Sequence, residues 1–213
     1  MHLTDLRNAD VLFTDVGTRA AEAAALALAE AGARVWLVSA RSERLHEVVD
    51  RVVAVGGHVD FRVMDLSSLD EVADLVVDVR AKAPRLRAVV DTGGPLTVEG
   101  LDALARGMEP GLSAEGGALL LLSEGTSVPR VSAELVDHLR RRSVAVHALL
   151  GGADPPEKWG DVVQYLSRLS GDAFVGSFED DALARALSTH GEEYVAAHLG
   201  ELAGPLPLLH SSS

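Results

Sequence analysis

The sequence contains no cysteine, only two lysines among its 213 residues, and no apolar run near the roughly 18 residues of a membrane span. Without cysteine, the chain has neither disulfides nor thiolate chemistry. The residues from Met1 to Arg7 lack the charged region and the following apolar stretch of a secretory signal peptide. These absences lead us to expect a soluble cytoplasmic protein.

Basic residues are outnumbered by acidic ones. Lysine and arginine total 19 against 32 aspartates and glutamates, which gives a formal net charge of −13. No block of like charge stands out along the chain. Because a basic face is what binds phosphate backbones and anionic lipids, we expect no nucleic-acid partner and no membrane association. The acidity itself indicates solubility rather than a fold.

Apolar segments with β-strand character alternate with segments of helical period. The expected strands are 11–15, 34–39, 58–64, 88–91, 118–122, 144–149 and 173–175. The expected helices are 19–31, 42–55, 69–83, 98–108, 132–142, 158–169 and a last stretch, 180–202, broken at Gly191. This alternation predicts an α/β fold, a single Rossmann-like doubly wound parallel sheet of about seven strands with helices on both faces. We expect one domain over residues 1–213, with a C-terminal helical extension at 180–210.

The first expected strand runs into a tight turn and a helix, which is how a dinucleotide-binding βαβ unit opens. The positions that carry glycine in such a turn hold Asp15, Arg19 and Ala21, and only Gly17 remains, out of step with the motif. A pyrophosphate needs bare backbone N–H groups at close range and no competing negative charge. Asp15 adds a carboxylate and Arg19 adds bulk, so the sequence predicts a damaged cofactor cradle.

Segments between residues 20 and 123 carry the motifs of one enzyme family in eroded form. Residues 20–39 are similar to a first helix and second strand, and residues 65–66 (Asp-Leu) to the end of a third strand. Residues 89–94 resemble the fourth-strand motif Asn-Asn-Ala-Gly, with Asp91 and Thr92 replacing the asparagines. Residues 116–123 resemble the strand that leads to a catalytic serine. In these segments the chain resembles the short-chain dehydrogenase/reductase family.

The resemblance implies a Rossmann fold, oxidoreductase ancestry and a site for a nicotinamide cofactor. In the family, Asp65 would lie beside the adenine, and Arg41 stands where NADP-preferring members often place a basic residue. The residues that would form this site, as a vestige, are Asp15, Gly17, Arg19, Arg41, Asp65 and Gly93. Because the turn is eroded, we expect no cofactor, and NADP is the disfavoured alternative.

The proton-transfer pair of the family is missing. Members use Tyr-x-x-x-Lys on one helix face, where the lysine lowers the tyrosine pKa for proton exchange with the substrate oxygen. Four residues after Tyr165 and Tyr194 stand Leu169 and His198, and residues 132–142 contain neither tyrosine nor lysine. The resemblance therefore predicts loss of the standard redox activity.

Two intervals are shorter than is typical of the family, from Gly94 to Ser123 and from Ser123 to Gly151. The missing material would belong to the helices of the usual dimer bundle, so any homo-oligomer should use a different surface. An apolar stripe near the C-terminus is one candidate, and it consists of Leu183, Leu187, Tyr194, Leu199 and Leu202. The preferred alternative is that this stripe packs on the sheet.

Acidic residues follow several expected strands. In the strand order 3-2-1-4-5-6-7, Asp15, Asp91 and Glu124 would end three neighbouring strands about 4.8 Å apart. Such a row could hold a cation or a cationic substrate group. We prefer the interpretation that these side chains cap helices or face water, and we expect no metal site. Arg19 either pairs with Asp15, binds another anion, or covers the helix N-terminus with its stem.

Three functions remain open. The leading hypothesis is a non-catalytic relative of the family that acts as a binding or partner subunit, pairing with an active reductase. The second is a non-redox enzyme of cyclase, lyase or hydratase type, with Asp91, Glu124 and Ser123 as candidate catalytic residues around a small-molecule ligand at the strand carboxyl edge. The third is an atypical NADP-dependent reductase, which Arg41 and Asp65 favour.

Overall fold

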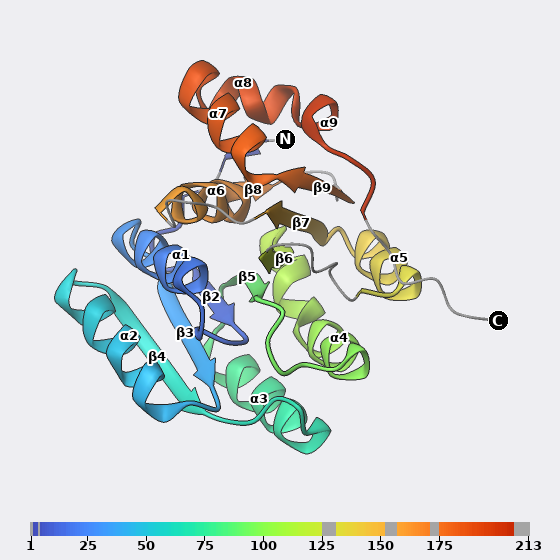
Figure 1. Ribbon diagram of the computed structural model, residues 1–213. Helices are drawn as coiled ribbons and strands as arrows, with labels where there is room; N and C mark the ends of the chain where they lie inside the picture. The colour runs from blue at the N-terminus through green and yellow to red at the C-terminus, as the bar shows by residue number, and fades with distance from the viewer. Residues whose placement is uncertain (1, 4, 125–130, 152–156, 171–174, 207–213) are drawn as a thin grey trace.

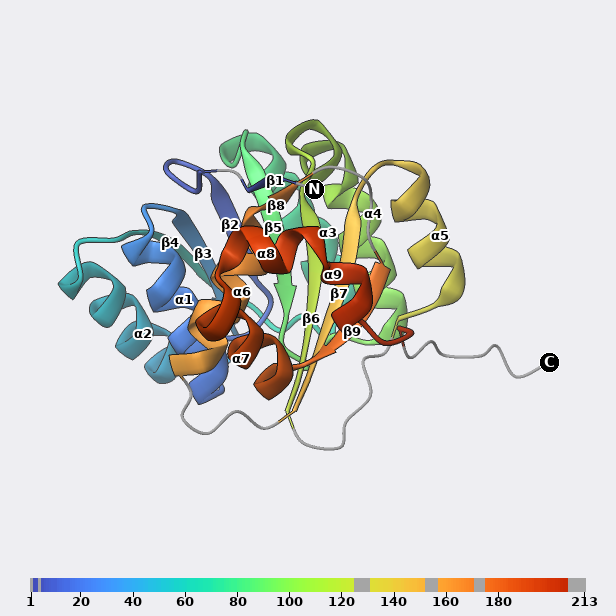
Figure 2. The ribbon, with the colours of Figure 1, turned by 90° about the horizontal axis from the view of Figure 1, so that it is seen from above.

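The chain forms one large parallel sheet between two layers of helices, seen in a computed structural model (Figures 1 and 2). The structure describes residues 2–3, 5–124, 131–151, 157–170 and 175–206. Seven strands make up the sheet, all parallel, in the order β4-β3-β2-β5-β6-β7-β9. They are β2 (Asp10–Phe13), β3 (Arg34–Ser39), β4 (His58–Val63), β5 (Leu86–Asp91), β6 (Ala118–Glu124), β7 (Ala145–Gly151) and β9 (Val175–Glu179). The predicted fold class and strand order are confirmed.

Helices cover both faces of the sheet because each strand is followed by a crossover. The bounds of the first six are α1 (Arg19–Glu30), α2 (Ser42–Ala54), α3 (Leu69–Lys82), α4 (Val98–Glu115), α5 (Ala133–Arg141) and α6 (Glu157–Arg168). One apolar core joins the sheet to α1, α2 and α6, and a second core joins the other face to α3, α4 and α5. All strand carboxyl ends therefore meet at one edge, where ligands bind in open α/β sheets.

The C-terminal region forms three short helices: α7 (Asp180–His190), α8 (Glu192–Ala197) and α9 (Leu199–Leu202). The break at Gly191, which has φ 80°, lies where the sequence predicted it. Leu183 and Leu199 are buried in the core that contains α1, whereas Tyr194 and Leu202 are exposed. Leu187 is partly buried against the same core, so three of the five residues of the apolar stripe pack inward, in agreement with the preferred interpretation.

Several features depart from the expected elements. Strand β2 ends at Phe13 rather than at residue 15, and β9 covers Val175–Glu179 rather than 173–175, of which 173 and 174 lie outside the described residues. Helix α4 continues past Met108 and through Pro110 to Glu115, because Met108 and Leu112 are buried on either side of the proline. The chain also has a two-stranded antiparallel ladder of β1 (His2–Leu3) and β8 (Leu169–Ser170), which the sequence did not indicate. Of the helices in the described residues, none is long and apolar enough to cross a membrane.

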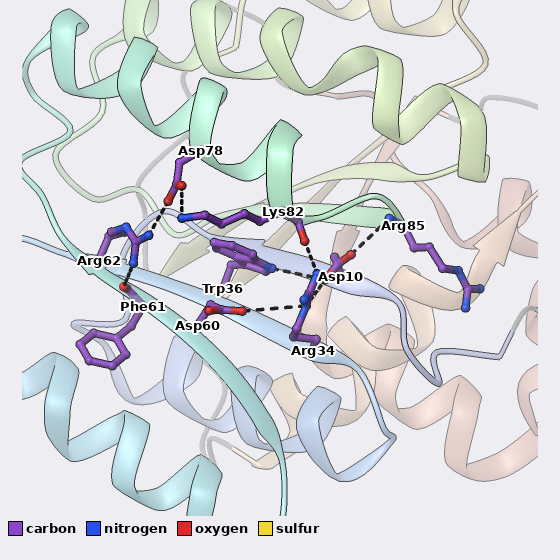
Figure 3. Close-up of polar contacts among 9 residues, drawn as sticks. All are labelled: Asp10, Arg34, Trp36, Asp60, Phe61, Arg62, Asp78, Lys82 and Arg85. Atoms are coloured by element: carbon purple, nitrogen blue, oxygen red, sulfur yellow. Dashed lines mark hydrogen bonds and ion pairs between the residues drawn. The ribbon is translucent and has the colours of Figure 1, made fainter.

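Asp10 holds together the amino-terminal edge of the sheet (Figure 3). Its buried carboxylate accepts hydrogen bonds from Arg34 Nε at 2.5 Å, Trp36 Nε1 at 3.3 Å and the main-chain N–H of Arg85 at 3.2 Å. The bond to Asp10 raises the pKa of Arg34. Arg34 Nη2 also donates to the carbonyl of Lys82 at 2.5 Å. One carboxylate therefore joins β2, β3 and the turn between α3 and β5.

Arg87 connects the two helical layers from within β5. Its buried guanidinium donates to the carbonyls of Ser167 at 3.0 Å and Leu169 at 2.8 Å, and also to that of Glu115. These carbonyls lie at the ends of α6 and α4, where a helix leaves its last C=O groups unpaired and its dipole favours a cation. Burial lowers the pKa of Arg87, and the nearby Glu115 partly offsets this effect.

We predict that Arg87→Met lowers the free energy of unfolding by roughly 3 kcal/mol, because buried carbonyls lose their donors. Urea denaturation measures this loss. Arg140→Met, at an exposed position in α5, is the matched control and should change stability little. Equal stability of the two variants would contradict the role given to Arg87.

A second prediction concerns His147, which is buried in β7 beside the ring of Phe178. Burial lowers its pKa from 6.5 to about 4. The unfolded chain therefore binds a proton that the folded chain does not, and stability falls as the pH drops from about 6.5 towards 4. Between pH 6.5 and pH 4 the free energy of unfolding of the wild type should fall by roughly 3 kcal/mol relative to that of His147→Leu. Urea denaturation at several pH values measures this difference. A constant difference between the two proteins would contradict the prediction.

Candidate functional site

The candidate site is the turn between β2 and α1, at the carboxyl edge of the sheet. Helix α1 begins at Arg19, and the Oγ1 of Thr18 accepts the N–H of Ala21 at 3.1 Å. This capping bond satisfies one of the main-chain donors at the helix start. It also means that a phosphate at this helix would have to compete with a hydroxyl for that N–H group.

Asp15 is the centre of the site and is bound from two neighbouring strands. Ser39 Oγ, at the end of β3, donates to Asp15 Oδ1 at 2.7 Å. Arg41 Nη2 lies 3.7 Å from Asp15 Oδ2, and the main-chain N–H of Arg41 donates to Ser39 Oγ at 3.2 Å. After β5, Thr92 Oγ1 donates to the main-chain carbonyl of Asp15 at 3.0 Å. The carboxylate is 13% exposed and is held in place by these contacts.

Two glycines leave room for this arrangement. A Cβ added to Gly17 would overlap the Arg41 guanidinium and lie 2.8 Å from Asp15 Oδ2. A Cβ added to Gly94 would lie 2.9 Å from the Cβ of Asp15. The Arg41 guanidinium therefore lies against the backbone of the turn, and the Asp15 side chain packs beside Gly94.

The pairing of Asp15 with Arg19, one of the sequence alternatives, is replaced by pairing with Arg41. Arg19 is the first residue of α1 and lines a groove of about 520 Å³ with Ala23, Leu26 and other residues of α1, α2 and α6. Arg41 comes instead from the end of the adjacent strand, which brings its guanidinium to the turn. The sequence alone does not show in which direction the Arg19 side chain points.

Asp91 ends β5 next to this turn and is almost fully buried. Thr14 Oγ1 donates to Asp91 Oδ1 at 2.8 Å. Burial raises the pKa of Asp91, and the charge of Asp15 raises it further, while hydrogen bonds from Thr14 and from the N–H groups of Thr92 and Gly93 partly offset the rise. Gly93 has φ 69°, in the left-handed region that favours glycine. Asp91 is thus a carboxyl group that the fold favours in its protonated form.

Asp65 lies apart from this cluster, after β4. Its Oδ1 accepts the N–H of Ser67 at 3.0 Å, and this bond lowers the pKa of the exposed carboxyl. Its own N–H donates to Glu71 Oε2 at 2.6 Å. Asp65 and Glu71 therefore stabilise the turn into α3. The preferred interpretation that Asp15 and Asp91 cap helices or face water is wrong, because both side chains are buried and accept hydrogen bonds from Ser39 and Thr14.

The remaining predicted residues are placed only by their backbone. Ser123 and Glu124 end β6, where they pair with Leu150 and Gly151 of β7, and their side chains lie outside the described residues. Strands β2, β5 and β6 are neighbours as predicted, but the expected row does not form. Asp15 lies two residues after the end of β2, and Asp91 pairs with Leu121, so the backbone of Glu124 is three residues beyond Asp91. Among the His, Asp and Glu side chains that the structure describes, no group of three or more could hold a metal ion.

Both tyrosines lie away from the carboxyl edge. Tyr165 is buried near the end of α6, which starts at that edge and runs back towards the amino ends of the strands. Burial raises the pKa of Tyr165, and its hydroxyl has no hydrogen-bond partner in the described structure. Tyr194 is exposed on α8, which packs on β1.

Thr14, Ser39 and Gly94 belong to the site although the sequence argument did not select them. Ser39 had a usable signal, since it is a polar residue at the end of an otherwise apolar strand that neighbours the turn. The spacing of residues in the sequence does not indicate that Gly94 lies close to Asp15.

We predict that Asp91→Asn removes a pH-dependent contribution of this buried carboxyl group to the free energy of unfolding. The folded-state pKa of Asp91 is raised, so the stability it contributes in acid is lost as the pH rises through that pKa. The variant should gain stability relative to wild type as the pH rises above the ordinary aspartate pKa of about 4, measured by urea denaturation at several pH values. Asp137→Asn, exposed on α5, is the control. A stability difference that does not vary with pH would refute the assignment.

Comparisons with known proteins agree with this architecture. Residues 14–106 match the family described as short chain dehydrogenase. A metagenomic short-chain oxidoreductase in complex with NADP has 21% identity and a TM-score of 0.70, and the match covers 83% of this chain and 97% of that one. Glucose dehydrogenase of Caenorhabditis elegans in the apo form has 16% identity and a TM-score of 0.63, with 82% and 98% covered. A 7α-hydroxysteroid dehydrogenase complexed with NADH and 7-oxo glycochenodeoxycholic acid has 16% identity and a TM-score of 0.65, with 82% and 96% covered.

No curated protein matches the sequence. The assignment therefore depends on the family match, which includes the turn at Asp15 and ends within α4, and on the shared fold. The sequence of residues 14–106 is thus similar to the short-chain dehydrogenase family, and the chain shares its fold with solved short-chain dehydrogenases.

Proposed function

We propose that this chain is a non-catalytic relative of the short-chain dehydrogenases that serves as a binding or partner subunit in a reductase system. The observation that carries the proposal is the Asp15 carboxylate, held on the turn by Ser39 with the Arg41 guanidinium across Gly17. These residues occupy the place where the family binds its cofactor.

The turn does not fit a nicotinamide dinucleotide. A diphosphate over Gly17 would displace Arg41, and it would then meet the Asp15 carboxylate at close range. Two like charges 4 Å apart repel by about 4 kcal/mol at the effective dielectric constant of a protein surface. Arg41 is largely exposed and free to swing away, but Asp15 is buried and hydrogen-bonded, so the repulsion stays. We therefore propose that the chain has no cofactor, although solved neighbours bind NADP or NADH.

Both tyrosines of the chain lie away from this edge, so neither can donate the proton in the chemistry of the family. The buried hydroxyl of Tyr165 lies near the other end of α6, and Tyr194 lies on α8. Neither has a lysine four residues later. A chain that has this scaffold, but neither the family's cofactor turn nor its tyrosine–lysine pair, is suited to binding rather than to redox catalysis. Its partner would be a small-molecule ligand at the carboxyl edge, an active reductase, or both.

A non-redox enzyme is the second candidate, and the state of Asp91 favours it. A buried carboxyl group with a raised pKa is the usual form of a general acid. The Thr14 bond and the two main-chain N–H bonds orient this group beside Asp15. Under this alternative, activity on a ligand would be lost in Asp91→Asn, whereas a binding subunit would keep its affinity.

We predict that the wild-type protein shows no saturable binding of NADPH or NADH by isothermal titration calorimetry and no hydride transfer to carbonyl compounds. Restoring the turn with Asp15→Gly, Arg19→Gly and Ala21→Gly should create saturable binding, with a dissociation constant at least about tenfold below the lower limit set for the wild type, because it removes the carboxylate and exposes main-chain N–H groups. The triple variant should remain unable to transfer hydride, since no proton donor is added.

Ala133→Gly is the matched control, because it introduces glycine at the first residue of α5, away from the turn. It should leave cofactor binding unchanged. Tight binding of NADPH by the wild type together with hydride transfer would refute the proposal.

A further inference from the structure

Strand β4 is the outermost strand at one side of the sheet, and in the described chain it pairs only with β3 (Figure 1). The N–H of Met64 donates to the carbonyl of Ser39, so Met64 directs its main-chain groups towards β3. Because alternate residues of an edge strand face opposite sides, Val59, Phe61 and Val63 direct their N–H and C=O groups away from the sheet. These three residues offer a ready pairing edge.

The side chains of β4 divide by face. Asp60 and Arg62 lie on the face that carries α3, where Arg62 Nη2 is 2.7 Å from Asp78 Oδ2 and Asp60 Oδ2 is 4.0 Å from Arg34 Nε. Val59 and Phe61 pack against the core on the opposite face, and Phe61 points away from Asp78 in Figure 3. Val63 belongs to this apolar face by alternation and is 49% exposed.

We propose that β4 is a self-association edge, pairing antiparallel with β4 of a second copy of this chain about a two-fold axis at Phe61. In that register Phe61 lies opposite the partner's Phe61, and Val59 lies opposite the partner's Val63. All of these residues direct their main-chain groups outward, so each meets a residue with matching donors and acceptors. The two sheets would become one continuous sheet.

The charges on β4 agree with this register. Around Phe61 the segment Val59-Asp60-Phe61-Arg62-Val63 is antisymmetric in charge and symmetric in apolar residues. Asp60 therefore lies opposite the partner's Arg62, and Arg62 lies opposite the partner's Asp60. These are non-hydrogen-bonded positions, where facing Cα atoms approach to about 4.5 Å and opposite charges are favourable. A strand of unrelated sequence would offer neither charge a partner from the second chain.

Further contacts on the described surface support the same occupant. Arg62 Nη1 donates to the outward carbonyl of Phe61 at 2.9 Å, a bond that a partner strand can replace. Val53 and Val55, at the end of α2 just before β4, are 59% and 43% exposed on the apolar side of this edge. They extend the area that a second copy would bury beyond the strand itself. The inference does not depend on the proposed function, since the edge lies away from Asp15.

Sedimentation equilibrium tests the proposal through charge reversal. The wild type should form a dimer of twice the 22.4 kDa chain mass. Asp60→Arg and Arg62→Asp each place like charges opposite one another at two symmetric positions, and each should raise the dissociation constant by about tenfold to a hundredfold. The double variant Asp60→Arg/Arg62→Asp should return to near the wild-type value, and an equimolar mixture of the two single variants should form a heterodimer.

Two more variants complete the design. Val63→Pro removes an outward N–H while keeping the bonds to β3, so it should also weaken the dimer. Asp137→Arg, exposed on α5, repeats the charge change elsewhere and should have no effect. Circular dichroism verifies that each variant is folded. A monomeric wild type would overturn the proposal, and so would a dimer that neither single variant weakens. The proposal would also fail if association were restored neither in the double variant nor in the mixture of the two single variants.

Discussion

The hydrogen bonds of Asp15 are the interactions on which the carboxyl edge of this sheet depends. Its carboxylate accepts the Ser39 hydroxyl, lies beside Arg41, and is packed against Gly17 and Gly94. The three strand ends β2, β3 and β5 are joined through this one residue, because Thr92 also binds its carbonyl. An anionic cofactor needs open main-chain N–H groups at this turn, and the network presents a negative charge there instead.

The scaffold beneath the site is held by interactions at the other edge. Asp10 joins β2, β3 and the start of β5, and Arg87 binds the ends of α4 and α6 from within β5. The apolar cores on the two faces are each built from strands and three or more helices. The Asp10 and Arg87 contacts do not involve Asp15, although Val16 of the same turn is buried in the core that contains α1.

Much of the fold could be predicted from the sequence, because strand and helix periods alternate and crossovers are right-handed. That positions 15 and 19 hold Asp15 and Arg19 rather than glycine was equally visible in the sequence. The side-chain partners were not: choosing Arg41 over Arg19 depends on which way each side chain leaves the backbone. Helix α4 crosses Pro110 because burial on both sides outweighs a local signal. The β1–β8 ladder is two residues long, too short to show a period. That Tyr165 is buried away from the site became clear only from the path of α6.

Our central claim is that the turn between β2 and α1 cannot hold a nicotinamide dinucleotide while Asp15 stays in place. A crystal structure of the protein grown with excess NADPH tests it most directly. The account predicts that Asp15 keeps its bond to Ser39, that Arg41 remains against Gly17, and that no dinucleotide density lies over the turn. A bound dinucleotide with its phosphates hydrogen-bonded to the main chain of residues 15–21 would contradict it.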